Sequence, residues 1–390
     1  MIRIPCSQLE AGMELASPVK HPGVVDHALL RAGYRFDVDM IKKLERFPVK
    51  AVWIRHPGFD FLDDKLRDAI PKSRRKLYHS IKRSFTGIAN KTSGAFDLIE
   101  YRTVVGNMIM SLIANKNHAV WAERLIDCSN ELFEHSANTA YLTLVIGMRI
   151  KDYICQERRR VSAKEADDLT NLGIGAMLHD LGKLGLDTQW HDVHFFQDRA
   201  DSDDYRGHPE RGYRAVQGRL EATAAVTVLH HHQRFDGHGF PRPEAYSKTK
   251  RLKKMEGHDI HIFSRVVAVA NTLDGLMGAH QKAGLPTVAA LASLNQPRFE
   301  GMFDPVVLDA ALRAIPPFPL GACVELSDGR QAVVIGLNET TPCQPTVLIL
   351  DQRPGEDTAP EELDLTKPNA PSIAKYDDHT VDQFYYALPA

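Results

Sequence analysis

The stretch LTNLGIGAMLHDLGKLG, residues 169–185, is the most informative part of the chain for its fold, because it combines a helical apolar pattern with an adjacent His-Asp pair. Apolar residues recur there at spacings of three and four, which is the period of an α-helix. His179 and Asp180 interrupt this apolar pattern, and burying two polar side chains is costly unless a partner compensates them. An imidazole nitrogen beside a carboxylate oxygen suits a first-row divalent metal. The stretch therefore predicts a core helix that carries metal ligands.

The same apolar periodicity surrounds this stretch and predicts a mainly α fold. It recurs in AERLIDCSNELFEHSANTAYLTLVIGMRI, in RLEATAAVTVLHHH and in FSRVVAVANTLDGLMG. Each segment is long enough for a core helix. We therefore expect an all-helical domain over residues 116–315.

The flanking regions differ from this domain in composition. Residues 1–60 combine short β-like runs, one helical stretch and many Pro and Gly residues, which predicts a small α+β regulatory or docking module. Residues 61–115 are expected to form a helical linker. Residues 316–352 carry β-branched runs separated by turn residues, which predicts a β-rich appendage. Residues 353–390 are rich in Pro, Asp and Glu, which predicts a weakly ordered tail whose last aromatic residues could dock.

Charge and cysteine content exclude several classes of protein. The 390 residues include 48 basic and 50 acidic side chains, for a net charge of −2. This balance argues against a protein that coats nucleic acid or an anionic membrane. No apolar run reaches the roughly 18 residues of a membrane span, and the N-terminal sequence lacks the features of a signal peptide. The five scattered cysteines are typical of a reducing compartment. We expect a cytoplasmic protein with neither DNA nor a membrane as a partner.

Histidines are concentrated in the expected helical domain. The chain has 18, and ten of them lie between His179 and His261. Histidine is the commonest metal ligand in proteins. Upstream of this region, Glu131 and His135 are four residues apart and so share one helix face. The concentration indicates a metal site, although some of these histidines are expected on the surface.

Two further features add to the candidate site. His208 follows a glycine and precedes a proline, which is typical of a helix start. His231 and His232 end a run of three, and we expect the first, His230, to point away from the site. Lys183 follows the His-Asp pair by one helical turn and could neutralise a phosphate oxygen.

In this order, the motifs ExxxH, HDxGK, HP, HH and DGxGFP resemble the HD-GYP family, a branch of the HD-domain metal-dependent phosphohydrolases. The resemblance covers residues 116–315. It implies an all-helical fold, two or three divalent metal ions, most often iron or manganese, and hydrolysis of cyclic di-GMP to pGpG or GMP. The N-terminal module also resembles the small domain of unknown function often found before HD-GYP domains.

The resemblance also implies roles for individual residues. The implied metal ligands are Glu131, His135, His179, Asp180, His208, His231, His232 and Asn271. Asp180 would bridge two metals and act in catalysis with Lys183, which would bind a substrate phosphate together with Lys282. A signature loop implied to contact a protein partner, such as a diguanylate cyclase, comprises Asp236, Gly237, Gly239, Phe240 and Pro241.

The chain departs from the family pattern at several positions. Asn271 stands where the family has an aspartate ligand, and it offers a carbonyl oxygen but no charge. His280 stands where the family has a substrate arginine, with Lys282 nearby as a partial substitute. In the signature, Gln233 replaces a glutamate and Phe240 a tyrosine.

One segment has no counterpart in the family pattern. The proline-rich stretch that usually follows HDxGK is replaced by LDTQWHDVHFFQDRADSDDYRGHP. His191 and His194 there are expected on the surface, with an additional metal ligand as the alternative.

Three functions are compatible with these observations. The first is a metal-dependent cyclic di-GMP phosphodiesterase. The second is a degenerate HD-GYP protein that binds metal, dinucleotide or a signalling partner without efficient turnover, which the residues at 233, 271 and 280 motivate. The third is an HD phosphohydrolase acting on other nucleotides or on (p)ppGpp, against which the histidine pair and the DGxGFP loop count.

Overall fold

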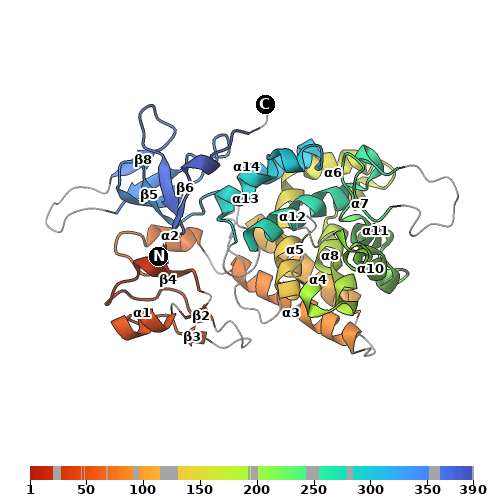
Figure 1. The fold of residues 1–390 in the computed structure, drawn as a ribbon, viewed down its shortest axis with the longest axis horizontal. Helices are drawn as coiled ribbons and strands as arrows, with labels where there is room; N and C mark the ends of the chain where they lie inside the picture. Colours follow the sequence, from red (N-terminus) through yellow and green to blue (C-terminus); the bar gives the residue numbers. More distant parts are fainter. Residues whose placement is uncertain are drawn as a thin grey trace.

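The computed structural model describes residues 1–20, 28–44, 46–47, 49–66, 69–90, 96–114, 131–191, 194, 201–242, 254–278, 284–350 and 361–388. A helical body forms one end of the molecule. At the other end, the N-terminal segments and a C-terminal sheet lie side by side (Figure 1). In the described part of the chain, no helix has both the length and the apolar character needed to cross a bilayer.

The helical body is built around α5 (Glu131–Arg149), which packs against α8 (Thr170–Leu178) and α12 (Ile262–Gly278). Every α5 residue from Leu132 to Gly147 is buried, because its apolar and small side chains occur on all faces of the helix. α11 (Ala222–His230) packs against α8. The prediction of a mainly α fold is confirmed.

Shorter helices complete this body. They are α6 (Lys151–Glu157), α7 (Ala163–Ala166), α9 (Asp203–Arg206), α10 (His208–Val216), α13 (Thr287–Leu294) and α14 (Pro305–Ala314). Among its described residues, the body also contains the 3-10 turns η2 (Leu181–Gly185), η3 (Thr188–Trp190), η6 (Gly257–Asp259) and η7 (Pro297–Phe299).

The segment expected to be a helical linker belongs largely to the helical core. α2 (Phe61–Lys65) is followed by α3 (Ala69–Ala89) and α4 (Leu98–Ala114). α3 and α4 bury Phe85, Tyr101 and Val105 in the same cluster as the side chains of α5 and α8. An apolar stripe with helical period drives this packing, and only the packing distinguishes a core helix from a linker helix.

The C-terminal region forms one six-stranded sheet of antiparallel pairs, in the order β10-β9-β5-β6-β7-β8. Its strands are β5 (Cys323–Leu326), β6 (Gln331–Gly336), β7 (Thr346–Ile349), β8 (Glu362–Asp364), β9 (Ile373–Tyr376) and β10 (His379–Thr380). Residues 361–388 therefore differ from the expected weakly ordered tail, since they supply three of the six strands. The backbone N–H of Ile373 donates to the Tyr385 hydroxyl at 2.7 Å, which fixes the last aromatic stretch to the sheet.

The N-terminal segments share a core with this sheet. β1 (Ile2–Pro5) pairs with β4 (Ala51–Ile54), and β2 (Val19–Lys20) pairs with β3 (Ala28–Leu30). The remaining elements of this end are α1 (Val38–Leu44), η1 (Cys6–Gln8) and η8 (Asp382–Phe384). Ile2 and Val52 belong to one hydrophobic cluster with Val324 and Val333 of the sheet. The two ends of the chain thus build a second core (Figure 1).

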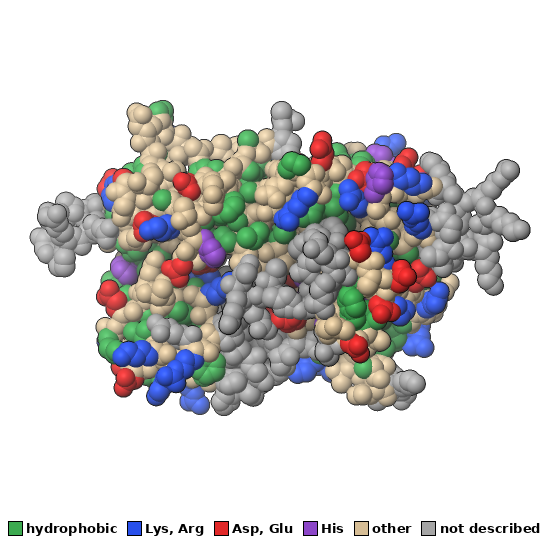
Figure 2. Space-filling model, viewed as in Figure 1, with side chains coloured by type: hydrophobic (Ala, Val, Ile, Leu, Met, Phe, Trp, Pro, Cys, Tyr) green, Lys and Arg blue, Asp and Glu red, His purple; other side chains and the backbone are tan. Residues whose placement is uncertain are grey.

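The molecular surface carries charges of both signs. On the face shown in Figure 2, Lys and Arg side chains are interspersed with Asp and Glu side chains. This arrangement agrees with the net charge of −2. The visible face therefore presents no uniform basic surface.

Candidate metal centre

Helix ends bring the candidate ligands together inside the helical body. His179 and Asp180 follow the end of α8, His208 begins α10, and His231 follows the end of α11. His135 lies in the second turn of α5. A helix end turns the chain, so side chains from successive helices can meet at one point. All of these side chains are buried.

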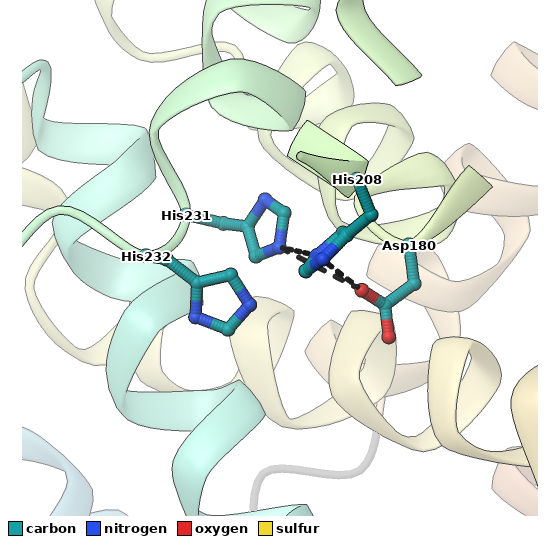
Figure 3. Close-up of side chains that lie close together, drawn as sticks. All are labelled: Asp180, His208, His231 and His232. Atoms are coloured by element: carbon teal, nitrogen blue, oxygen red, sulfur yellow. Dashed lines mark hydrogen bonds and ion pairs between the residues drawn. The ribbon is translucent and has the colours of Figure 1, made fainter. Parts of the chain in front are cut away.

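The first group of ligands, here called the three-histidine cluster, consists of Asp180, His208, His231 and His232. One ligand atom from each lies within 4.8 Å of the others. The His208 and His231 rings point toward Asp180, and His232 lies beside them (Figure 3). The His208 Nε2 atom is 3.1 Å from Asp180 Oδ1, and the His231 Nε2 atom is 3.7 Å from it. This donor set suits a first-row divalent cation.

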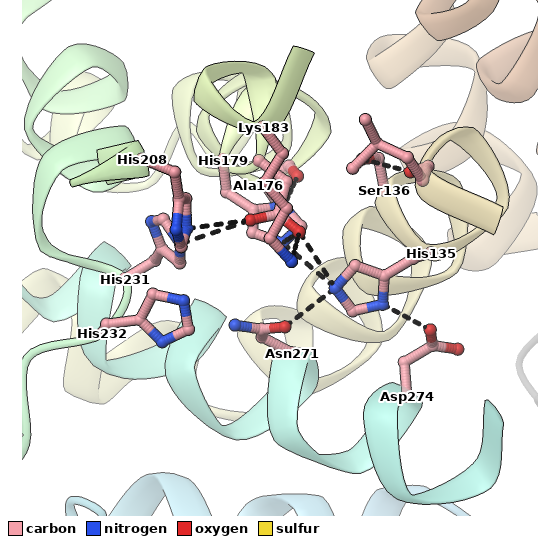
Figure 4. A network of polar contacts seen from close by, with 12 residues as sticks. His135, Ser136, Ala176, His179, Lys183, His208, His231, His232, Asn271 and Asp274 are labelled. Atoms are coloured by element: carbon pink, nitrogen blue, oxygen red, sulfur yellow. Dashed lines mark hydrogen bonds and ion pairs between the residues drawn. The ribbon is translucent and has the colours of Figure 1, made fainter. Parts of the chain in front are cut away.

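The second group, here called the asparagine cluster, consists of His135, His179, Asp180 and Asn271. The two imidazoles and the carboxylate again offer ligand atoms within 4.8 Å of one another. Asp180 Oδ2 is 3.4 Å from His179 Nε2 and 3.6 Å from His135 Nε2. Asn271 Oδ1 lies 2.9 Å from His135 Nε2 (Figure 4). Asp180 therefore belongs to both clusters, through a different oxygen in each.

Hydrogen bonds fix the orientation of four histidine rings. The Nδ1 atom of His179, of His208 and of His231 lies 2.8, 2.6 and 2.8 Å from the backbone carbonyl three residues earlier. A carbonyl can only accept, so each Nδ1 carries the proton. His135 directs its Nδ1 to the Asp274 carboxylate at 2.7 Å. In each neutral ring the Nε2 lone pair is then bare, as in histidines that ligate metals.

The unprotonated Nε2 atoms and the shared carboxylate converge, with no hydrogen atom between the facing nitrogens. The Nε2 atoms of His208 and His231 face each other at 3.1 Å, and those of His135 and His179 at 3.3 Å. Neither oxygen of Asp180 accepts a hydrogen bond of good geometry from the described residues. Facing lone pairs in a buried site repel each other unless a positive charge lies between them. The residues present therefore fit divalent cations.

Burial and charge set the protonation states that such a site needs. Burial alone would raise the pKa of Asp180, but Lys183 and His179 outweigh it and hold that pKa well below its usual range. Burial lowers the pKa of His208 to about 4 and that of His231 to about 3, although Asp180 opposes both shifts. At neutral pH the carboxylate is thus ionised and these two rings are neutral. These are the forms that bind metals.

Lys183 lies inside the site. Its side chain is 1% exposed, and its Nζ atom is 2.8 Å from Asp180 Oδ2. The ammonium group also lies 5.2 Å from the centre of the Tyr205 ring. Tyr205 is fully buried, and its hydroxyl is 3.4 Å from His232 Nε2. The lysine therefore supplies the positive charge nearest to the shared carboxylate.

The segment predicted as a signature loop closes over His232. The Phe240 ring stacks on the His232 ring, with centroids 4.6 Å apart. The Gln233 amide nitrogen donates to the Pro241 carbonyl at 2.6 Å, and Gln233 is buried. Only glycine fits at position 239, because a Cβ there would lie 2.4 Å from the Arg234 backbone nitrogen. Phe240 therefore packs inward against a candidate ligand.

The acidic end of this loop is held by a local turn. Asp236 accepts a hydrogen bond from the His238 backbone N–H at 3.0 Å and pairs with the Arg234 guanidinium. Gly237 between them has a φ of +73°, a left-handed conformation that glycine adopts without strain. The side chain of Asp236 is therefore used within the loop.

The structure places the remaining predicted residues differently. Glu131 begins α5, one turn before His135, and is not part of either group of converging ligand atoms. His280 and Lys282 lie outside the described residues. His230 contributes to neither cluster, and burial, reinforced by His261, lowers its pKa to about 4.

Some functional neighbours were misjudged or missed by sequence reasoning. His194 is buried, contrary to the surface expectation, and its ring lies 4.9 Å from the His135 ring. His191 is half-buried. Asp274 orients His135 through a hydrogen bond. Asp274 lies about one turn after Asn271, but the sequence could suggest this role only if the contact between α5 and α12 were already known. No sequence pattern indicated Tyr205, whose carbonyl orients His208.

Comparisons with known proteins add independent findings. A family model described as "HD domain" matches residues 123–307, and one described as "KOW domain associated with HD domain" matches residues 323–381. The cyclic di-GMP phosphodiesterase PA4108 of Pseudomonas aeruginosa is 24% identical over 368 residues, which cover 85% of this chain and 81% of that protein. The second match thus spans both the expected β appendage and part of the expected tail.

Two further similarities are more limited. The cyclic di-GMP phosphodiesterase response regulator RpfG of Xanthomonas campestris is 30% identical over 154 residues, which cover 38% of this chain and 37% of that protein. Among solved structures, Bd1817, an HDGYP protein from Bdellovibrio bacteriovorus, aligns with a TM-score of 0.44 at 16% identity, covering 80% of this chain and 98% of that one.

Proposed function

The chain belongs to the HD-GYP family, and from this premise we propose that it is a metal-dependent phosphodiesterase that hydrolyses cyclic di-GMP to pGpG or GMP. The observation that carries the proposal is the convergence of bare histidine nitrogens on the two oxygens of Asp180. The printed activity of the similar proteins from Pseudomonas and Xanthomonas supports the choice of substrate.

The two clusters would each hold a divalent cation, with Asp180 as the shared ligand. The three-histidine cluster would supply His208, His231 and His232, and the asparagine cluster His135, His179 and Asn271. Glu131 is proposed as a further ligand, and with it the site could bind a third cation. Iron or manganese are the proposed metals. Bound cations of this kind lower the pKa of a water and neutralise charge on the phosphodiester oxygens.

The chain's own side chains would hold and orient the reacting groups. Lys183 keeps Asp180 ionised and is proposed to bind a substrate phosphate, with which its ammonium could form an ion pair as it now does with the carboxylate. Asp274 and the three backbone carbonyls keep the histidine protons on Nδ1, away from the centre. Lys282 is proposed to add a second substrate contact.

The loop from Asp236 to Pro241 is proposed to bind a protein partner such as a diguanylate cyclase. Its outermost side chain is that of His238, which is 72% exposed. Phe240 faces inward and stacks on His232, so a partner that moved this loop would also shift the His232 ring. Contact with a partner could in this way affect the three-histidine cluster.

A binding protein without efficient turnover is the second candidate, and Asn271 favours it. This neutral amide lies 2.9 Å from a bare ligand nitrogen, where a carboxylate would add negative charge for a cation. Weaker metal binding in the asparagine cluster would leave the scaffold able to bind the dinucleotide but slow to cleave it.

One experiment separates these functions. The protein is expressed with iron and manganese supplied, metal per chain is quantified, and cyclic di-GMP is followed by chromatography with and without added Mn²⁺. The control is the double variant His179→Ala with Asp180→Ala, which removes ligands from both clusters. About two metals per chain, with product formed only by the wild type, is the expected result.

Other results would contradict the proposal. Bound metal with intact dinucleotide would identify a binding protein. Faster hydrolysis of (p)ppGpp than of cyclic di-GMP would identify a different HD phosphohydrolase. Unchanged metal content in the double variant would show that the metals bind elsewhere.

A further inference from the structure

A cavity of about 630 Å³ lies where the helical body meets the second core, far along α5 from the candidate metal centre. α5 contributes Val145, Met148 and Arg149, and α14 contributes Arg313. The opposite side comes from Lys65 of α2 and from residues 335–339 at the end of β6. Both bodies of the protein therefore form its walls.

The lining of the cavity combines apolar and polar groups. Leu112, Val145, Met148, Leu320 and Ile335 line it, together with prolines at 316, 317 and 342. A cavity of several hundred cubic ångströms has the size of small-molecule sites, in which apolar side chains contact the body of the ligand and polar groups orient it. The lining predicts an occupant with a compact apolar body.

The charged side chains of the cavity favour an anion. Arg149 pairs with Glu339 at 2.7 Å, and Arg313 pairs with Asp309 at 2.8 Å. Lys65 directs its Nζ atom to the carbonyl oxygen of Ile335 at 3.5 Å, and it pairs with no carboxylate among the described residues. Three cations and two carboxylates leave one positive charge in excess. Each guanidinium also has five N–H donors, and its single carboxylate partner leaves some of them for a ligand.

From these walls and charges we infer that the cavity is a binding site for a small organic monoanion with an apolar body. The anionic group would pair with Lys65 and Arg149, and the apolar body would lie against Met148 and Leu320. This inference is independent of the proposed hydrolysis. The cavity and the candidate metal centre nonetheless share one helix, because Arg149 and His135 both lie on α5, about 21 Å apart at 1.5 Å per residue.

A matched pair of fluorescent probes tests the inference in the full chain. The anionic probe is 8-anilinonaphthalene-1-sulfonate, and the neutral probe is N-phenyl-1-naphthylamine, which has a similar aromatic body without the sulfonate. We expect the anionic probe to bind one site per chain, more tightly than the neutral one. Added salt should weaken its binding, because the charges at the rim are partly exposed.

Variants then assign the binding to this cavity. Lys65→Met with Arg149→Met keeps unbranched, flexible side chains and removes two charges, and it should weaken binding of the sulfonate about tenfold. Leu337→Trp, at a lining residue that is 38% exposed, should block the cavity and abolish this binding. Arg102→Met is the control, because Arg102 is an exposed cation on α4 outside the lining.

Two results would overturn the inference. One is equal binding of the sulfonate by the wild type and by both cavity variants, with thermal unfolding unchanged. The other is binding of the neutral probe as tight as that of the sulfonate, which would show that the site does not select an anion.

Discussion

The two halves of the candidate metal centre share Asp180 but differ in the chemistry of their other ligands. The three-histidine cluster adds three imidazoles to the carboxylate, whereas the asparagine cluster adds two imidazoles and a neutral amide. The Asp274 carboxylate is close to the asparagine cluster, but it accepts a hydrogen bond from His135 Nδ1, the ring nitrogen that points away from the cluster. In the proposed function, the two clusters would bind their cations with unequal strength, because Asn271 adds no negative charge to one of them.

The largest effect is expected for the shared carboxylate. Asp180→Asn removes a negative charge from both clusters, so metal content should fall from about two per chain to nearly none. Elemental analysis after dialysis measures this loss. Asp187→Asn, at an exposed acid seven residues later, should change nothing. Retention of one metal by Asp180→Asn would show that the two halves are independent.

Acidification should act next most strongly, because protons compete for the buried rings. The pKa of His208 is lowered to about 4 and that of His231 to about 3, mainly by burial, whereas an unfolded histidine titrates near 6.5. Below pH 6.5 the unfolded chain therefore binds more protons than the folded one. The free energy of unfolding of the metal-free protein should be highest above pH 6.5 and fall steadily toward pH 4. Urea denaturation at several pH values measures it, and a flat profile would contradict the neutral assignment.

Single ligand substitutions should distinguish the halves directly. His208→Gln removes a ligand of the three-histidine cluster and should abolish the tighter binding step. His179→Gln removes a ligand of the asparagine cluster and should abolish the weaker step. Equilibrium dialysis against buffered Mn²⁺ resolves the two steps. Loss of the same step in both variants would mean that the protein has a single cation site.

Restoring charge should strengthen the weaker half. Asn271→Asp should raise the cation affinity of the asparagine cluster about tenfold, because a carboxylate replaces an amide oxygen. Without metal, the same variant should unfold at a lower temperature, since a new buried charge would lie close to Asp180. Asn271→Ala is the control and should lower cation affinity without adding charge. No change in either affinity or melting temperature for Asn271→Asp would place this residue outside the cation site.

The smallest effect is expected in the loop that packs on the three-histidine cluster. Gln233→Glu replaces the donor to the Pro241 carbonyl with an acceptor, which should lower the free energy of unfolding by about 1–3 kcal/mol. Chemical denaturation measures the change, and Gln217→Glu at an exposed glutamine serves as the control. Equal stability of both variants would show that the loop does not depend on this bond.

Much of the fold class could be predicted from the sequence, because it depends on local spacing. Apolar residues at helical period located α5, α8, α11 and α12, and the order of the polar motifs placed His135, Asp180 and His208 on or beside them. Residue type alone also indicated metal chemistry, since clustered imidazoles and a carboxylate within apolar helices require a compensating charge.

Tertiary structure decided what depends on contacts between distant segments. The helices at 69–89 and 98–114 became core elements only by packing on α5 and α8, and the segments at 362–364 and 373–376 became strands only by pairing with β7 and β5. The orientation of His135 by Asp274 joins positions 139 residues apart. Such pairings depend on which surfaces meet after folding, and composition and local period carry no information about that choice.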